Sequence, residues 1–163
     1  MKFTEAYQNL TRLPSPKIKK IITADLLKRI EDLYANQFNE QHIQMKIDFD
    51  GNPGSFNGDM EMLEQVLINL VKNAIEAVSQ SVPPLVELVV SKPADHQVSI
   101  IVRDNGEGIP REDLDKIFVP FYSTKPSGSG IGLSVSRQII LMHRGKLEVR
   151  SQPGKGSEFE SLL

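Results

Sequence analysis

Asp104 lies in the segment RDNGEGIP, directly after the apolar run VSIIV. An ionised carboxylate only accepts hydrogen bonds, so at the base of a pocket it would select a ligand edge with an N–H donor, such as the exocyclic amine of adenine. Gly106 and Gly108 would let the backbone turn sharply and approach a flat base, and Ile109 would cover one face of its ring. A hairpin turn explains this octapeptide equally well, because Asn-Gly and Gly-x-Gly after a strand are strong turn signals.

Glycines at alternate positions precede the helical pattern in SGSGIGLSVSRQII. Gly128, Gly130 and Gly132 would leave backbone N–H groups and the positive end of the helix dipole accessible to a ligand at the helix start. Phosphate is the ligand that such a site favours. A flexible Gly/Ser connector is the alternative. The spacing fits neither a P-loop nor a Rossmann loop. In the preceding segment PFYSTK, Lys125 would reach a terminal phosphate, although exposed loop lysines are usually only solvated.

Asn69 and Asn73 lie one helical turn apart in the segment EMLEQVLINLVKNAIEAV. Its apolar positions fill the other side of the helix, which is therefore core: Leu63, Val66, Leu67, Leu70, Val71, Ala74, Ile75 and Val78. The side-chain oxygen of Asn73, at the border of that face, suits magnesium, which takes few protein ligands and the rest from phosphates and water. Simple solvation of both asparagines is the alternative. A site this weak would need a nucleotide to bring the metal.

Composition excludes several classes of function. The chain has 163 residues, 39% of them hydrophobic and 25% charged, with a net charge of -2 and no cysteine. These values are typical of one folded domain with neither disorder nor a membrane span, and they disfavour binding to nucleic acid or an anionic membrane. The lack of cysteine excludes disulfides and thiolate metal sites and fits a reducing cytosol. No charged and then apolar leader opens the chain, so no secretion signal is expected.

Hydrophobic periodicity predicts the elements that must position these residues. The pattern over residues 1–13 is helical, and two prolines follow. Helices are predicted from Thr23, as N-cap, to Phe38, and over 59–79, 111–118 and 130–143; strands over 43–50, 85–92, 96–104, 146–151 and 157–163; and loops over 51–58 and 119–130. Phe118 and Phe121 are expected to anchor the second loop to the core. This order predicts an α+β fold, with a layer of helices on a mainly antiparallel sheet.

Five segments occur in the order typical of one family. They are NLVKNA, DNGEGI, FVPFY, GSGIGL and GKGSEF, which resemble the N box, first glycine box, F box, second glycine box and last glycine box. From about Ile22 to its end the chain resembles the catalytic ATP-binding (HATPase_c) domain of sensor histidine kinases, within the GHKL superfamily. The short segment YSTKPS is similar to the lid of nitrogen-regulation-type kinases. The resemblance implies a two-layer α/β sandwich, the Bergerat fold, with helices on one face of a mixed, mainly antiparallel sheet and ATP beneath a mobile lid.

The resemblance also implies roles for individual residues. Asn73 would hold Mg2+, Asp104 would read adenine, and Lys125 would act on the phosphates. The remaining ATP-binding positions would be Gly106, Gly108, Ile109, Gly128, Ser129, Gly130, Ile131, Gly132, Leu133 and Ser157. Asn69 stands where hydrolysing relatives carry a general-base glutamate, and an amide takes no proton at neutral pH, so phosphoryl transfer to a protein group is favoured over attack by water. Glu76 departs from the pattern, because many family members place lysine or arginine there.

The histidine of the family's phosphoacceptor box has no counterpart in this chain, since the surroundings of His42, His96 and His143 do not resemble it. Residues 1–17 are therefore interpreted as the end of a dimerisation hairpin and a linker, and 18–163 as the catalytic domain. The predicted reaction transfers the γ-phosphoryl group of ATP to a histidine on the missing hairpin, which then supplies a response regulator. The fragment is expected to be monomeric and unable to label itself. Its parent is expected to be a homodimer acting in the cytoplasm, with or without a membrane anchor.

Two alternatives stay open. One is a stand-alone serine kinase of the anti-sigma type, against which the F box and the hairpin-like N-terminus argue. The other is a nucleotide-binding regulatory module without transfer activity, which Glu76 and the missing acceptor histidine leave possible.

Overall fold

A five-stranded sheet forms the base of the computed structural model, which describes residues 13–52, 54–94, 96–125 and 128–163. The strand order is β2-β4-β5-β7-β6. The strands are β2 (Gln44–Phe49), β4 (Leu85–Ser91), β5 (Ser99–Asp104), β6 (Lys146–Gln152) and β7 (Gly156–Leu162). β2 pairs with β4 in parallel, and the other three neighbouring pairs are antiparallel. The predicted mixed, mainly antiparallel sheet is confirmed. The helical pattern over 1–13 lies almost entirely outside the described residues.

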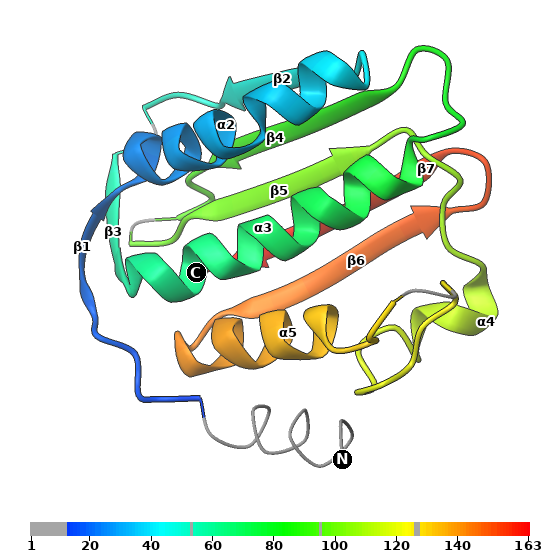
Figure 1. The fold of residues 1–163 in the computed structure, drawn as a ribbon. Helices are drawn as coiled ribbons and strands as arrows, with labels where there is room; N and C mark the ends of the chain where they lie inside the picture. Colours follow the sequence, from blue (N-terminus) through cyan, green and yellow to red (C-terminus); the bar gives the residue numbers. More distant parts are fainter. Residues whose placement is uncertain (1–12, 53, 95, 126–127) are drawn as a thin grey trace.

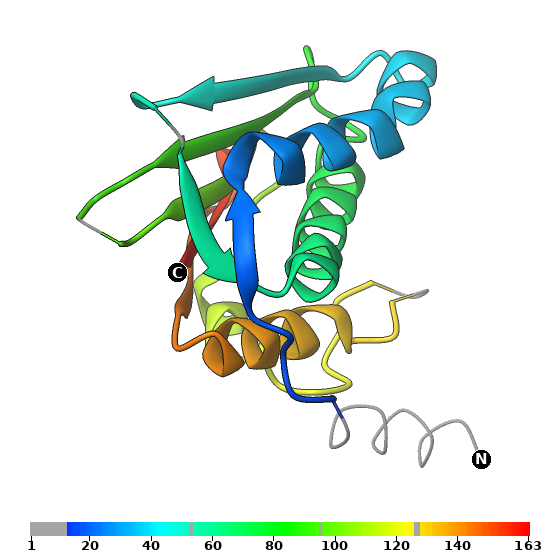
Figure 2. The ribbon, with the colours of Figure 1, turned by 90° about the vertical axis from the view of Figure 1, so that its left-hand side faces the viewer.

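Three helices cover one face of this sheet, so the fold has the two layers that the sequence predicts (Figures 1 and 2). They are α2 (Thr23–Glu40), α3 (Met60–Ala77) and α5 (Gly132–Met142). The short α4 (Arg111–Leu114) lies in the connection between β5 and α5. In the part of the chain that the structure describes, no helix has the length and apolar character to cross a membrane.

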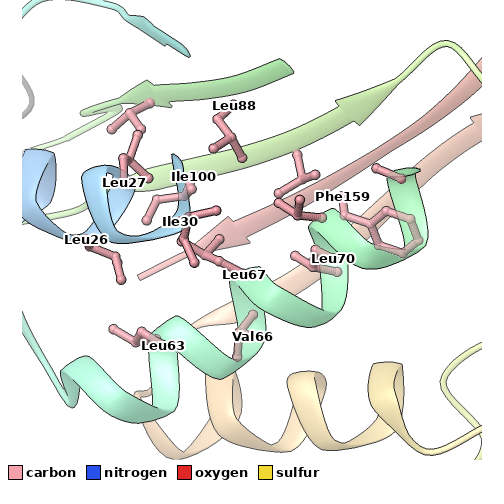
Figure 3. Close-up of a cluster of buried hydrophobic side chains, with 14 of the residues drawn as sticks. Leu26, Leu27, Ile30, Leu63, Val66, Leu67, Leu70, Leu88, Ile100 and Phe159 are labelled. Atoms are coloured by element: carbon pink, nitrogen blue, oxygen red, sulfur yellow. The ribbon is translucent and has the colours of Figure 1, made fainter. Parts of the chain in front are cut away.

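The central helix α3 carries the predicted core on one side. Its buried residues are Met62, Leu63, Val66, Leu67, Leu70, Val71, Ala74 and Ile75. Figure 3 shows members of this set facing Leu26, Leu27 and Ile30 of α2 and Leu88, Ile100 and Phe159 of the sheet. Each fully buried large aliphatic side chain contributes about 1.5–3 kcal/mol of transfer free energy, so the rotation of α3 about its axis is strongly determined. The side of α3 that carries Asn69 and Asn73 is thereby turned toward α5 and the lid.

The start of α3 is capped by Asp59, whose carboxylate accepts the backbone N–H of Met62 at 3.1 Å. The same carboxylate accepts the backbone N–H of Lys17 at 2.6 Å. The Asp59 N–H in turn donates to Nε2 of His143, the residue that ends α5, at 2.9 Å. The N-terminal segment, α3 and α5 therefore meet at this capping residue.

Two predictions about the N-terminal part of the chain are wrong. Thr23 is not the N-cap of α2, because Ile22 holds that position and Thr23 is a fully buried helical residue whose N–H donates to Gly54 O at 3.1 Å. The predicted loop 51–58 contains a strand, β3 (Ser55–Gly58), which pairs antiparallel with β1 (Lys19–Ile22). Such short strands carry no periodic signal, and each is stabilised by a partner far away in the sequence. Ile21 and Phe56 face the core from this ribbon.

Candidate functional site

A cavity of about 800 Å³ lies between α3, the ends of β5 and β7, and the segment that runs from the first glycine box to the start of α5. Most of the predicted site residues line it: Asn69, Asn73, Asp104, Gly108, Ile109, Lys125, Gly128, Ser129, Gly130, Gly132, Leu133 and Ser157. Gly106 and Ile131, which were also predicted to bind the ligand, are not among the lining residues. The fold therefore brings four separate sequence segments to one cavity.

Asp104 ends β5 and lies opposite Ser157 of β7, at the floor of the cavity. Its side chain is 7% exposed, and Oδ1 accepts the backbone N–H groups of Gly106 at 2.9 Å and Ser157 at 3.3 Å. Burial raises the pKa of Asp104 above its ordinary value, and these two hydrogen bonds oppose part of that rise. In the described part of the chain, Oδ2 has no hydrogen-bond partner, so it is available to accept from a ligand.

Two glycines of this segment lie against protein backbone. A Cβ on Gly106 would overlap the carbonyl oxygen of Ala77 at the end of α3, and a Cβ on Gly108, whose φ is +74°, would overlap the carbonyl of Gln152. They permit close packing of protein backbone, and their role in letting the backbone approach a base stays a prediction. The packed loop places Ile109 at the cavity, and its N–H donates to Ser151 Oγ at 2.8 Å.

Ser151 belongs to the site in a way that the sequence did not indicate. Its hydroxyl accepts from Ile109 and lies 2.8 Å from the hydroxyl of Ser157, its partner across the β6–β7 pair. It thereby connects the first glycine box to the last one. A serine inside a polar strand has no distinctive local signal. The register of the β6–β7 hairpin would have identified Ser151 as the residue opposite Ser157.

The lid loop, residues 119–130, is held at both ends. Phe121 N–H donates to Gly130 O at 2.9 Å, and Tyr122 Oη donates to Asp113 Oδ1 at 2.5 Å. Phe118 and Phe121 pack against the hydrophobic core, which confirms the anchoring role predicted for them. Gly130 has a φ of +67°, which a helical residue does not adopt, and α5 begins two residues later at Gly132, close to the predicted start near Gly130.

The first turn of α5 lies at the cavity with Gly132 and Leu133. Its N-cap is Ile131, and among the described residues, which omit 126–127, no side chain accepts a hydrogen bond from this helix start. The carbonyl of Ile131 accepts the N–H of Val135 at 2.9 Å and the hydroxyl of Ser134 at 2.7 Å, so Ile131 serves the helix start and not the cavity wall. Uncapped N–H groups and the positive end of the helix dipole favour an anion at this position.

The two asparagines of α3 differ in what they contact. Asn69 Nδ2 donates to Gly132 O at 3.2 Å and to Ser136 Oγ at 3.1 Å, so Asn69 joins α3 to the start of α5. Asn73 is half-buried at the cavity, and its side chain makes no hydrogen bond within the described part of the chain. Its neutral oxygen donor fits a hard cation such as magnesium. The described residues include no cluster of three or more His, Cys, Asp or Glu side chains that would hold a metal alone.

Glu76 follows Asn73 on the cavity-facing side of α3 and forms an ion pair with Lys125 of the lid, with 2.5 Å between Oε2 and Nζ. The predicted phosphate-binding lysine therefore contacts α3 in this structure. The N–H of Gly128 donates to Lys125 O at 3.1 Å, so this predicted phosphate donor is also engaged within the lid.

Residues 58–163 match the family of histidine kinase-, DNA gyrase B- and HSP90-like ATPases. Sporulation kinase C of Bacillus subtilis is 39% identical over 140 residues, which are 85% of this chain and 32% of that kinase. The chain thus spans about a third of the length of this relative. The nucleotide-free catalytic domain of histidine kinase ThkA aligns with a TM-score of 0.81 at 29% identity, over 90% of this chain and 95% of that domain.

ThkA in complex with the response regulator protein TrrA aligns with a TM-score of 0.82 at 24% identity, over 99% of this chain and 47% of the kinase. That likeness shows the fold. The match over residues 58–163 covers most of the chain, and the resemblance read from its motifs is confirmed: this chain belongs to the histidine kinase-, DNA gyrase B- and HSP90-like ATPase family. The detail of a nitrogen-regulation-type lid stays a prediction.

Proposed function

We propose that this chain is the catalytic domain of a two-component sensor histidine kinase and that it transfers the γ-phosphoryl group of ATP to a histidine on a helical hairpin outside the chain. The observation that carries the proposal is the lining of one cavity. It combines the free carboxylate oxygen of buried Asp104, the free amide of Asn73 and the uncapped first turn of α5. These three groups suit adenine, a phosphate-bound cation and phosphate oxygens respectively.

Each group has a share in orienting the nucleotide. Oδ2 of Asp104 accepts the adenine amine, while Oδ1 stays with the N–H groups of Gly106 and Ser157. The N–H groups at Gly132 and Leu133 receive phosphate oxygens, and Lys125 neutralises the terminal phosphate. Asn73 would hold magnesium, which supplies charge neutralisation of the phosphates when it is bound.

The choice of acceptor follows from Asn69. Its amide stands at the general-base position of the hydrolysing relatives, its NH₂ group is already donating to Gly132 and Ser136, and an amide does not accept a proton at neutral pH. Water is therefore poorly activated. A histidine imidazole is itself a nucleophile: its nitrogen forms the bond to the γ-phosphorus, the bond from that phosphorus to the β–γ bridging oxygen breaks, and ADP leaves with the electron pair.

The proposed boundaries are the end of the hairpin and a linker over residues 1–17 and the catalytic domain over 18–163. The hydrogen bond from Lys17 N–H to Asp59 and the pairing of β1, which begins at Lys19, support a junction at this point. The complex of ThkA with a response regulator supports a regulator as the partner of the parent protein. We further propose that the fragment is a monomer and that its parent is a homodimer whose kinase part acts in the cytoplasm.

Radiolabelled ATP tests the proposal with three samples: the chain alone, the chain with the separately expressed hairpin of its parent, and an Asn73→Ala chain with the same hairpin. We expect acid-labile label on the hairpin histidine in the second sample only. Rapid acid-stable labelling of the chain alone would indicate the serine-kinase alternative. Rapid release of phosphate would indicate an ATPase, and nucleotide binding without any transfer would indicate a regulatory module.

A further inference from the structure

The ion pair between Glu76 and Lys125 joins two elements on opposite sides of the cavity. Glu76 lies on α3, one helical turn after Asn73, and Lys125 lies on the lid. Their side chains are 41% and 36% exposed, and Nζ is 2.5 Å from Oε2. An ion pair this exposed contributes little to the stability of the fold, so its significance lies in where it is. It places a carboxylate where polyphosphate is proposed to bind.

The other acidic side chains at the cavity face different surroundings. Asp104 is engaged with backbone N–H groups at the floor, and Asp113 accepts from Tyr122 and lies near Lys116. Glu107 lines the cavity from the first glycine box, and among the described residues it forms no ion pair with Lys125. Among the described lid residues, 119–125 and 128–130, Lys125 is the only cationic side chain. Glu76 and a bound polyphosphate would therefore compete for the same ammonium group.

We propose that Glu76 is a specificity-determining residue that makes polyphosphate binding at this cavity depend on a divalent cation. The inference rests on the proposed function, because it takes ATP as the ligand. When Lys125 pairs with the phosphates, Glu76 loses its ion-pair partner and lies near several negative charges. This is unfavourable unless a cation binds between Glu76 and the phosphates. The free amide of Asn73, one turn away on the same helix, is positioned to share that cation with the phosphates.

Lys72 of α3 also lines the cavity, and the first turn of α5 favours phosphate with or without a metal, so metal-free nucleotide is bound more weakly at this site but is not excluded from it. If Lys125 stays with Glu76, the phosphates lack a cationic partner from the lid; if Lys125 leaves, the Glu76 carboxylate repels them. Lysine or arginine at position 76 would instead attract phosphate whether or not a metal is present. Glu76 thus converts a site for polyphosphate into a site for its metal complex.

The test measures the dissociation constant of ATP by calorimetry in excess Mg2+ and in excess EDTA, and compares the two. Glu76→Gln removes the charge and keeps the shape of the side chain. We expect the variant to bind metal-free ATP about three- to tenfold more tightly than the wild type, as removal of one like charge near a protein surface predicts, with a smaller change for Mg-ATP. Glu64→Gln is the matched control, because Glu64 lies on α3 and pairs with Arg29 at 3.2 Å without lining the cavity.

Lys125→Met provides a second measurement. It should weaken the binding of metal-free ATP, and adding Glu76→Gln to it should recover part of the loss, because the unpaired carboxylate is then removed. If the wild type binds ATP but the ratio of its two dissociation constants is unchanged in Glu76→Gln, this inference is overturned and the proposed function stands. If the wild type fails to bind Mg-ATP, the proposed function fails and the inference fails with it.

Discussion

Asp104→Asn is the sharpest test of how this cavity recognises a base, because it keeps the shape of the side chain and changes one hydrogen-bonding group. The N–H groups of Gly106 and Ser157 can only donate, and both reach Oδ1 in the structure. The carbonyl oxygen of asparagine must therefore keep that position. Its NH₂ group then takes the place of Oδ2, and a donor replaces the acceptor that faces the ligand.

The size of the effect follows from the lost bond. A hydrogen bond to a charged group contributes about 1.5–3 kcal/mol, so the variant should bind ATP about 10- to 150-fold more weakly. Guanine presents an acceptor oxygen where adenine presents its amine. The affinity of the variant for GTP should therefore fall much less than its affinity for ATP, or should rise. We expect the preference for ATP over GTP to shrink sharply in Asp104→Asn.

Displacement of a fluorescent nucleotide by ATP and by GTP measures both quantities, and circular dichroism verifies that the variant is folded. Asp48→Asn is the control, since Asp48 is exposed on the edge strand β2 and does not line the cavity. Unchanged ATP affinity in Asp104→Asn, or an unchanged ratio of ATP to GTP affinity, would refute the assignment of Asp104 to adenine.

Four further predictions concern pH, the metal, the helix cap and the lid. Because burial raises the pKa of Asp104, ATP affinity measured by calorimetry should begin to fall on acidification while the pH is still above the ordinary value of 3.8. Asn73→Ala should abolish most of the gain in ATP affinity that Mg2+ provides; an undiminished gain would exclude Asn73 as a ligand. Asp59→Ala should lower the free energy of unfolding in urea by about 1 kcal/mol through loss of the cap. Burial favours a higher pKa for Asp59, but the backbone N–H groups of Lys17, Met62 and Glu61 together with nearby His143 outweigh it and lower the pKa. The stabilisation is therefore present above the ordinary value of 3.8 and is lost as the pH falls through the depressed pKa. A difference between variant and wild type that persists at the lowest pH would contradict this. A broad-specificity protease should cleave the lid more slowly when an ATP analogue is bound, and equal rates would count against contact between the lid and phosphate.

The sequence by itself determined the elements whose signal is local. The apolar spacing of α3 predicted both its length and the side that faces the core, because a long helix repeats its pattern several times. The alternation of apolar and polar residues predicted β2, and two neighbouring apolar runs predicted the hairpin of β4 and β5. The order of the five motifs was sufficient for the family, and most of the predicted ligand-binding positions line one cavity.

The tertiary structure alone decided what depends on partners distant in the chain. β1 and β3 exist because each pairs with the other, and the sequence of either strand is too short to show it. The available oxygen of Asp104 is defined by Ser157, 53 residues away, and the partner of Lys125 is Glu76, 49 residues away. Gly106 is glycine because the end of α3 approaches it, which no turn rule could foresee. Local patterns report the periodicity of one segment, whereas hydrogen bonds, ion pairs and close backbone contacts between segments are set only when hydrophobic burial brings those segments together.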